Sequence, residues 1–567
     1  MKRFPVIVAV CTAVAVLLTG CGGSPPADLV IHGGPIYTVD DARPSAGLVA
    51  VRDGRIVHVG DAADSSNWIG TATRVIDLNG RTLIPGFVEG HGHFYGTGLK
   101  QLQVDLTGTG NYAEVVERVA AAAAELPAGT WIEGRGWHQS KWDPPAAPMV
   151  KGFPVHDALS AAVPDHPVYI KHASGHAALV NATAMTLAGI DRSTPDPAGG
   201  EIIRDARGNP TGLLNEKAAA LVSVHIPVAT PEKTRRVMDQ AMAACLEHGV
   251  TSFVDAGTAP RHLALMEKMA ATGELSVRLY VMLDSDSTAL LDKWYAQGPA
   301  VGLGDGFLTV RAVKLRADGA LGSRGAWLLA DYSDRSGHHG HETTPMDSIE
   351  AWAERALLAG FQVGTHAIGD RANREVLDRY EAVLKRHPDN AGDHRFRIEH
   401  AQHLSAADIP RFAELGVIPA MQAIHMASDR PWAIDRLGIE RIEEGAYVWR
   451  KLLTSGACIV NGTDVPVEPI SPIACFYASV TRRTLAGDPP GGYEPDQRMT
   501  RAEALRSYTL DAAYGSFEED VKGSIEVGKY ADFAVLSQDI LTVPDDALLD
   551  TRVEMTIVDG VVRYERR

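Results

Sequence analysis

The sequence predicts an α/β protein: a distorted (β/α)8 TIM barrel, a small β-sandwich domain built from both chain ends, and an insertion after the first barrel strand. Three observations support this prediction. Short β-rich runs occur at both ends of the 567 residues, apolar runs alternate with Ala/Leu/Glu-rich stretches in the middle, and the first two apolar runs stand about 160 residues apart. At roughly 150 residues per domain, this length and a hydrophobic share of 45% predict more than one domain and a large buried core.

Residues 28–84 and 521–567 are expected to form the β-sandwich domain. Both ends contain short apolar runs separated by Asp-Gly and Asn-Gly pairs, which are typical hairpin turns. Because the two ends share this pattern and flank a different middle, we expect them to build one domain. The expected strands are Leu29–His32, Gly47–Val51, Ile56–Val59, Arg74–Asp77, Ala531–Leu536, Glu554–Val558 and Val561–Tyr564.

Residues 85–520 are expected to form the barrel, because runs typical of buried strands alternate there with helical stretches. Eight such runs occur, which is the number that closes a barrel. The first two are much further apart than a βα loop requires, so an insertion is expected at about residues 100–225. The eight runs are Thr82–Val88, Thr251–Asp255, Arg278–Met282, Thr309–Leu315, Phe361–His366, Arg395–His400, Val417–Gln422 and Cys458–Asn461.

The first 27 residues are expected to lie outside the fold. Lys2 and Arg3 precede the apolar run Val6–Leu18, which is short for a membrane span and typical of a secretory signal. The ending Leu18-Thr19-Gly20-Cys21 resembles the bacterial lipobox, whose cysteine becomes a lipidated N-terminus. We expect residues 1–20 to be a lipoprotein signal peptide and residues 21–27 a tether, so that Cys21 anchors the protein to the extracytoplasmic side of a bacterial cell membrane. The alternative is an ordinary signal peptide or a single-pass anchor, with Cys21 incidental.

Charge and cysteine content exclude some classes of protein. The chain has 71 acidic and 54 basic side chains, a net charge of −17, which argues against nucleic acid as a partner. Beyond the signal and Cys21, the cysteines Cys245, Cys458 and Cys475 are odd in number and widely spaced, so no disulfide framework is expected.

The tripeptide His-Gly-His occurs twice. His91-Gly92-His93 follows the first expected barrel strand, whereas His339-Gly340-His341 lies in a polar segment, Ser336–Thr344. Side chains two residues apart point to the same side of a strand, so a pair at the C-terminal end of a barrel strand can direct both imidazoles into the barrel mouth. Such a pair can bind one metal ion. The second copy has no strand to orient it, and we expect a solvated loop or, alternatively, a lid contact.

Further candidate ligands stand at the ends of later strands. Lys314, His366 and His400 end the fourth, fifth and sixth expected strands, and Asp464 follows the eighth. A single histidine at a strand end is more often a hydrogen-bonded core residue than a ligand, but five such positions around one rim favour a shared site. Imidazoles with a carboxylate and an open position activate water on a divalent ion, and we expect zinc, with one or two ions per chain.

Several of these residues belong to segments that carry a family resemblance. The segments are Pro85–His93, Val313–Lys314 with Asp318–Arg324, Thr365–Asp370, Ile398–His400 and Gly462–Pro466. Together they resemble the metal-dependent amidohydrolase superfamily, and within it the amidohydrolase family 3 branch, which includes N-substituted formamide deformylase. The resemblance extends from about Asp28 to the C-terminus, and Gly523–Asp532 resembles that family's return into its sheet domain. The motifs are specific for the branch but not for a substrate.

The resemblance implies a role for each matching residue. It implies that His91 and His93 bind the more buried metal, that His366 and His400 bind a second metal or the substrate, and that Asp464 is both ligand and proton shuttle. Lys314 matches a position that many members carboxylate to bridge two metals; the alternative is an unmodified lysine bound to a carboxylate. Substrate contacts, or contacts that support the ligands, are expected from His176, His425 and Arg324, with Arg324 the weaker candidate.

We therefore expect a lipid-anchored, metal-dependent hydrolase that cleaves a carbon–nitrogen bond other than a peptide bond in a small molecule, such as an amide or an N-substituted formamide. One alternative on the same site is hydrolysis of an ester, lactone or cyclic amide, or deamination of a ring. An alternative of another class is a solute-binding lipoprotein with a structural metal. Against it, structural zinc sites are closed by four protein ligands, often cysteines, and the candidate set contains none. Glu89 stands where the family commonly has Asp, and Thr463 where it commonly has Ser, but every proposed ligand is in place.

Overall fold

The computed structural model describes residues 25–567. The expected signal peptide, Cys21 and the first part of the tether lie outside these residues. Within the described part of the chain, none of the helices combines the length and the apolar character needed to cross a membrane.

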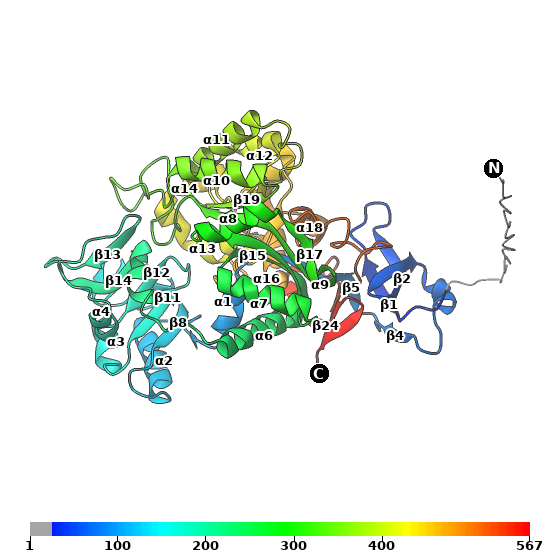
Figure 1. The fold of residues 1–567 in the computed structure, drawn as a ribbon, viewed down its shortest axis with the longest axis horizontal. Coiled ribbons are helices and arrows are strands. Elements are labelled where there is room, and N and C mark those ends of the chain that lie inside the picture. The colour runs from blue at the N-terminus through cyan, green and yellow to red at the C-terminus, as the bar shows by residue number, and fades with distance from the viewer. Residues whose placement is uncertain (1–24) are drawn as a thin grey trace, which may run out of the picture.

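The middle of the chain forms the predicted barrel (Figure 1). Its eight parallel strands follow one another in chain order around the sheet, and the short β17 (Ala300–Gly302) pairs antiparallel with the fourth of them. The first and last strands approach each other closely at Gly90. A Cβ at this position would lie only 2.3 Å from the carbonyl oxygen of Asn461. The eight strands are β6 (Phe87–Gly92), β15 (Val250–Thr258), β16 (Arg278–Asp284), β18 (Leu308–Arg316), β19 (Gln362–Ala367), β20 (Arg397–His400), β21 (Ile418–Met421) and β22 (Val460–Asn461).

One expected strand is divided between two sheets. The run Thr82–Val88 was expected to be the first barrel strand, but β5 (Thr82–Pro85) pairs outside the barrel and β6 begins at Phe87. The two strands meet at Gly86, where a Cβ would lie 2.2 Å from the Thr251 hydroxyl oxygen. The apolar run is continuous across this change of sheet, so hydrophobicity alone could not locate it.

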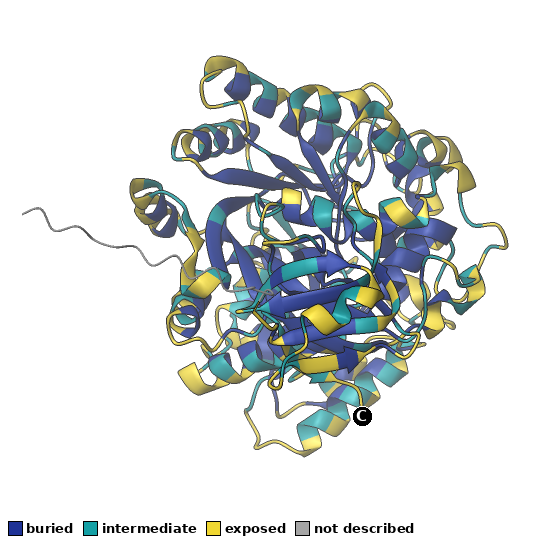
Figure 2. Cartoon of the chain, turned by 90° about the vertical axis from the view of Figure 1, so that its right-hand side faces the viewer, coloured by how far each residue is buried: buried dark blue, intermediate teal, exposed yellow. Residues whose placement is uncertain are grey.

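Both chain ends contribute to a single eight-stranded sheet. β5 lies between a strand from the N-terminal segment and one from the C-terminal segment, so it joins the two. Figure 2 views the molecule from the side that carries this sheet; buried residues are concentrated on strands, and exposed residues on turns and outer helices. Besides β5, the strands are β1 (Leu29–Tyr37), β2 (Ser45–Arg52), β3 (Arg55–Gly60), β4 (Arg74–Asp77), β23 (Phe533–Leu536), β24 (Val553–Val558) and β25 (Val561–Glu565).

The insertion between β6 and β15 has its own six-stranded sheet and its own apolar core, which includes Trp137, Leu159, Ile170 and Leu213. The insertion and the eight-stranded sheet built by the two chain ends lie at opposite ends of the molecule (Figure 1). Its strands are β7 (Val104–Asp105), β8 (Ile132–Trp137), β11 (Val168–His172), β12 (Ala177–Val180), β13 (Gly200–Arg204) and β14 (Pro210–Glu216). The larger helices against this sheet are α2 (Tyr112–Ala124), α3 (Asp157–Ala162) and α4 (Ala182–Leu187).

Helices surround the barrel strands, and the sequence marks the N-termini of some of them with capping residues. Thr230 caps α6 by accepting a hydrogen bond from the Lys233 amide, and proline occupies its first turn. Thr500 and Glu503 form a capping box at α17. The helices of this layer are α1 (Phe94–Lys100), α6 (Pro231–Glu247), α7 (Pro260–Ala271), α8 (Thr288–Gln297), α10 (Met346–Leu358), α11 (Asp370–Arg386), α12 (Ile409–Leu415), α13 (Ala423–Leu437), α14 (Ile439–Gly445), α15 (Trp449–Ser455), α16 (Pro472–Thr481), α17 (Arg501–Ser507) and α18 (Leu510–Tyr514).

Candidate metal centre

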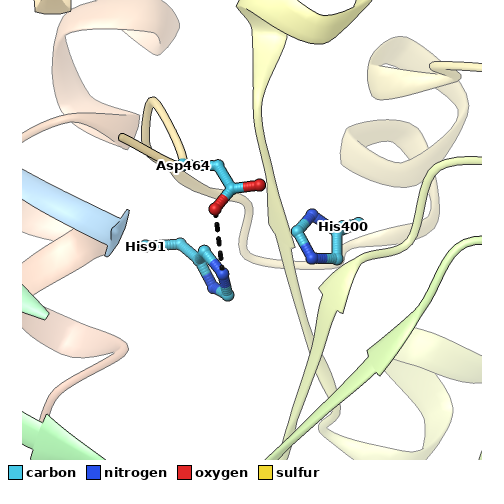
Figure 3. Close-up of side chains that lie close together, drawn as sticks. All are labelled: His91, His400 and Asp464. Carbon is cyan, nitrogen blue, oxygen red and sulfur yellow. Dashed lines mark ion pairs between the residues drawn. The ribbon is translucent and has the colours of Figure 1, made fainter. Parts of the chain in front are cut away.

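Candidate ligands converge at the C-terminal ends of the barrel strands. His91 lies on β6, His366 on β19 and His400 at the end of β20, while Asp464 lies in the loop after β22. Ligand atoms of His91, His400 and Asp464 all lie within 4.8 Å of one another, and all three residues are buried. Figure 3 shows the three side chains directed toward a common space, with the ion pair between His91 and Asp464 marked.

The orientation of the His91 ring is fixed by a buried chain of polar contacts. Its Nδ1 contacts the carboxylate of Glu399, which also accepts hydrogen bonds from the Arg397 guanidinium at 2.8 and 3.0 Å. Because Nδ1–H donates a hydrogen bond to this carboxylate, Nε2 is the nitrogen with a lone pair, and it faces the mouth. That nitrogen lies 3.7 Å from Asp464 Oδ1 and 3.3 Å from Lys314 Nζ.

His400 is held in the same way by a neutral partner. Its Nδ1 lies 2.7 Å from Oε1 of Gln422, whose amide nitrogen donates to the Ala420 carbonyl at 3.0 Å. The second hydrogen bond fixes the amide so that Oε1 accepts from the ring, which leaves Nε2 as the ligand atom. His400 has a backbone φ of 75°, a left-handed conformation that is costly for a residue with a Cβ.

The imidazoles at this mouth are in the form that binds metals. Burial, followed by the neighbouring Lys314 or by other imidazoles, lowers the pKa of His91, His366 and His400 well below the ordinary value of 6.5. The rings are therefore neutral at physiological pH, with a free lone pair. The ring centroids of His366 and His400 are 4.5 Å apart, so His366 borders the same space.

The loop that carries Asp464 is tied to the first barrel strand. The Asp464 amide donates to the His91 carbonyl at 2.8 Å, and the Thr463 amide donates to Glu89 at 2.6 Å. The Thr463 hydroxyl lies 2.9 Å from the second Glu89 oxygen. Burial raises the pKa of Glu89 to about 8. These contacts place the Asp464 carboxylate beside the His91 ring.

Lys314 lies inside the site and is buried. Burial lowers its pKa to about 8, so a substantial fraction of the amine is neutral near physiological pH. Its Nζ contacts the same His91 nitrogen that faces Asp464.

The remaining predicted site residues separate into two groups. His93 Nε2 lies 3.2 Å from Asp464 Oδ1, and His425 Nε2 lies 3.7 Å from Asp464 Oδ2. His176 Nδ1 donates a hydrogen bond to the Glu216 carboxylate at 2.9 Å, and the His176 and His366 ring centroids are 5.3 Å apart.

Arg324 and the second His-Gly-His pair lie elsewhere. Arg324 forms an ion pair with Asp334 at 2.8 Å and borders a separate hollow that also contains His338 and His341. The expected contact of Arg324 with the substrate therefore finds no support in its position. His339 is half exposed and lies 3.9 Å from Asp331.

The donor set fits a divalent metal ion. In the described part of the chain, Asp464 Oδ1, His366 Nε2 and His425 Nε2 are buried and make no hydrogen bond. Buried polar atoms without partners are rare, and three that border one space indicate a missing binding partner. Imidazole nitrogens with a carboxylate oxygen are ligands suited to zinc and similar ions.

Several supporting residues were not assigned roles from the sequence. Glu399 and Gln422 orient the two ligand histidines, and Asp318 accepts amide hydrogen bonds from Trp327, Ile368 and Gly369 at 2.8 to 3.0 Å. Glu399 immediately precedes His400, and Asp318 begins one of the family-like segments. The positions of Glu399 and Asp318 within those segments were the available signal, whereas Gln422 lies outside them.

A parallel eight-stranded barrel with neutral imidazoles and a carboxylate at the carboxyl ends of its strands defines a metal-dependent hydrolase. Comparison with known proteins supports the same class. Residues 74–564 match the sequence profile of the Amidohydrolase family. The chain belongs to the amidohydrolase family, as its motifs indicated.

Individual relatives cover nearly the whole chain. YtcJ of Bacillus subtilis (strain 168), an amidohydrolase by name, is 32% identical over 547 residues, which cover 94% of this chain and 99% of YtcJ. N-substituted formamide deformylase of Arthrobacter pascens is 30% identical over 558 residues, covering 95% of this chain and 98% of that enzyme. The crystal structure of an uncharacterized metal-dependent hydrolase from Pyrococcus horikoshii OT3 has a TM-score of 0.73 at 26% identity, covering 91% of this chain and 99% of that one.

Proposed function

We propose that this protein hydrolyses a carbon–nitrogen bond other than a peptide bond, in an amide or an N-substituted formamide, with zinc as the metal. The observation that carries the proposal is the Asp464 carboxylate, which is buried beside the ligand histidines and whose Oδ1 lies 3.2 Å from His93 Nε2 and 3.7 Å from His91 Nε2. The similarity to N-substituted formamide deformylase supports the substrate class.

The residues that would hold the metal are His91, His93, His400 and Asp464, with His366 and Lys314 available for a second ion. A divalent ion bound there supplies a Lewis acid that polarises the carbonyl and lowers the pKa of water to roughly 7. We also propose that Lys314 carries a carbamate, because burial favours the neutral amine that carboxylation requires.

Asp464 would move the proton during the reaction. Water adds its oxygen to the carbonyl carbon, and its proton passes to the Asp464 carboxylate. The same carboxyl then protonates the nitrogen as the carbon–nitrogen bond breaks, so that a neutral amine leaves and a carboxylic acid, or formic acid from a formamide, remains. Asp464 Oδ1 is suited to this role because it makes no hydrogen bond in the described structure.

The wall of the mouth would orient the substrate and exclude water. His176, His366, His425 and Asp464 border a hollow that is closed on other sides by Leu321 and Trp432. His176 is held by Glu216, and burial and the Glu216 carboxylate act in opposite directions on its pKa, which is raised. A protonated His176 can donate a hydrogen bond to a substrate carbonyl.

A substrate panel tests the proposal. The metal-loaded full chain is assayed with N-substituted formamides, acetamides, esters, lactones, cyclic amides and adenine, with and without chelator. We expect chelator-sensitive turnover of formamides or acetamides. Turnover confined to esters, lactones, cyclic amides or adenine would replace the amide assignment, and no turnover of any of them with full metal occupancy would contradict it.

A further inference from the structure

Two hollows meet at His176 on the barrel mouth. One, described above, borders His366, His400 and Asp464. The other borders His93 and Asp318 and extends toward the insertion, where Arg135 and Lys171 line it. A substrate whose scissile bond lies at the metal ligands can therefore place a substituent in the second hollow.

Arg135 and Lys171 are placed side by side by the insertion sheet. Arg135 lies on β8 and Lys171 on β11, and the two residues are direct partners in the parallel pairing of these strands. Partner residues on adjacent strands project to the same face of a sheet. Their two positive charges therefore face the hollow together.

The guanidinium of Arg135 is fixed in position. Its Nε donates to the Pro466 carbonyl at 3.1 Å and its Nη2 to the Ala173 carbonyl at 2.9 Å. Pro466 lies two residues after Asp464, so the guanidinium is anchored to the catalytic loop. Burial lowers the pKa of Arg135 to about 10, which leaves it charged at neutral pH.

The two cations have no ion-pair partner among residues 25–567, whereas the acidic residues of this hollow are occupied. Glu216 pairs with His176, Asp286 lies 3.8 Å from Arg316, and Asp318 accepts three backbone hydrogen bonds. In a chain with a net charge of −17, two adjacent cations that form no salt bridge among the described residues favour an anionic ligand.

We propose that Arg135 and Lys171 bind a carboxylate on the substrate, so that the enzyme acts on amides or formamides that carry a carboxylate near the scissile bond, as an N-formyl amino acid does. The inference rests on the proposed function. An arginine presents a planar set of donors that matches a carboxylate, and a lysine beside it adds a second charge-assisted hydrogen bond. The nearby Asp464 carboxylate would disfavour a more highly charged anion.

The matched substrates are N-formylphenylalanine and N-formyl-2-phenylethylamine, which differ only by the carboxylate. For the unmodified enzyme we expect kcat/KM to favour N-formylphenylalanine by about ten- to a hundredfold. Lys171→Met should raise KM for N-formylphenylalanine by at least about tenfold, with little change in kcat, and leave the uncharged formamide unaffected. Arg135 is left unchanged, because its loss would also release the Pro466 carbonyl.

Lys233→Met is the control. Lys233 is an exposed lysine on α6 that pairs with Glu133 at 3.8 Å, outside both hollows. This variant should retain the preference for the carboxylate. Equal kcat/KM for the two formamides in the unmodified enzyme, or a preference that Lys171→Met does not reduce, would overturn the proposal.

Binding without turnover separates this inference from the proposed function. Calorimetry with 3-phenylpropanoate measures carboxylate binding directly, and we expect at least about tenfold weaker binding by Lys171→Met. Binding that this variant does not weaken would contradict the carboxylate site. If 3-phenylpropanoate binds as expected while no amide is hydrolysed, the carboxylate site stands and the proposed reaction fails.

Discussion

The two His-Gly-His tripeptides are identical in sequence and differ in almost every physical property. His91 lies at the end of a barrel strand, is completely buried, and contacts Glu399, Lys314 and Asp464. His339 lies in the connection between β18 and α10, is half exposed, and lies 3.9 Å from Asp331. A motif of this kind acquires its chemistry from the backbone that orients it and from the partners around it. The difference can be tested from both sides.

The largest effect is expected from removing the pair at the barrel mouth, His91 and His93. His91→Ala with His93→Ala should lose most of the bound metal and reduce kcat/KM on the order of a thousandfold or more, because ligands and Lewis acid are lost together. Metal analysis and steady-state kinetics measure both. The matched control, His339→Ala with His341→Ala, should retain metal and activity, and equal metal loss from this control would contradict the assignment.

Asp464 is a buried acidic neighbour of His91 and His93, whereas the acidic neighbour of His339 is the half-exposed Asp331. Asp464→Asn is nearly isosteric but cannot accept a proton, so we expect a folded protein that retains at least the metal held by His91 and His93 and loses at least about a hundredfold in kcat. Circular dichroism and metal analysis establish that the variant is intact. Near-normal kcat in a folded, metal-loaded variant would remove Asp464 from the reaction.

Lys314 is a further polar neighbour of His91, whose Nε2 lies 3.3 Å from Lys314 Nζ. If it bridges two metals as a carbamate, Lys314→Ala should lose one metal per chain, and small carboxylic acids should restore part of the activity. Metal stoichiometry gives the answer directly. One metal per chain in the fully active unmodified enzyme would exclude the bridge.

A smaller effect is expected from the residue that orients His400. Gln422→Met removes the acceptor for the ring Nδ1 while preserving size, and we expect metal affinity to fall about ten- to a hundredfold. Competition with a chromogenic chelator measures the affinity. Gln103→Met, on the insertion, serves as the control, and unchanged affinity in Gln422→Met would show that the contact does not tune the metal.

The smallest effect on catalysis is expected at the N-terminus. We propose that the mature chain begins at a lipidated Cys21, so Cys21→Ser should move the protein from the membrane to the soluble fraction or leave its precursor uncleaved, without changing kcat. Fractionation and intact mass spectrometry of protein from the native host measure this. An unmodified N-terminus in the unmodified protein would contradict the anchor.

The fold was largely predictable because the apolar runs are long enough to mark buried strands, and all eight barrel strands formed where a run was present. The change of sheet at Gly86 was not, because the apolar run is continuous there and the strands that pair on either side, β23 with β5 and β15 with β6, come from distant parts of the chain. At the site, His91, His366 and His400 lie on the strands β6, β19 and β20, whose ends the apolar runs indicated. Arg324 shows the limit of this reasoning, since its motif continues past the strand into a loop that directs it toward Asp334.

The hydrogen bonds between Glu89 and Thr463 also bear on how the site assembles. These residues are 374 positions apart, on the first barrel strand and in the loop after the last. The ligand set therefore cannot exist in a nascent chain until almost the whole barrel has been synthesised and the ends of its sheet have met. Metal can then stabilise the closed barrel but cannot nucleate it. Metal occupancy in this protein should consequently report that folding is complete.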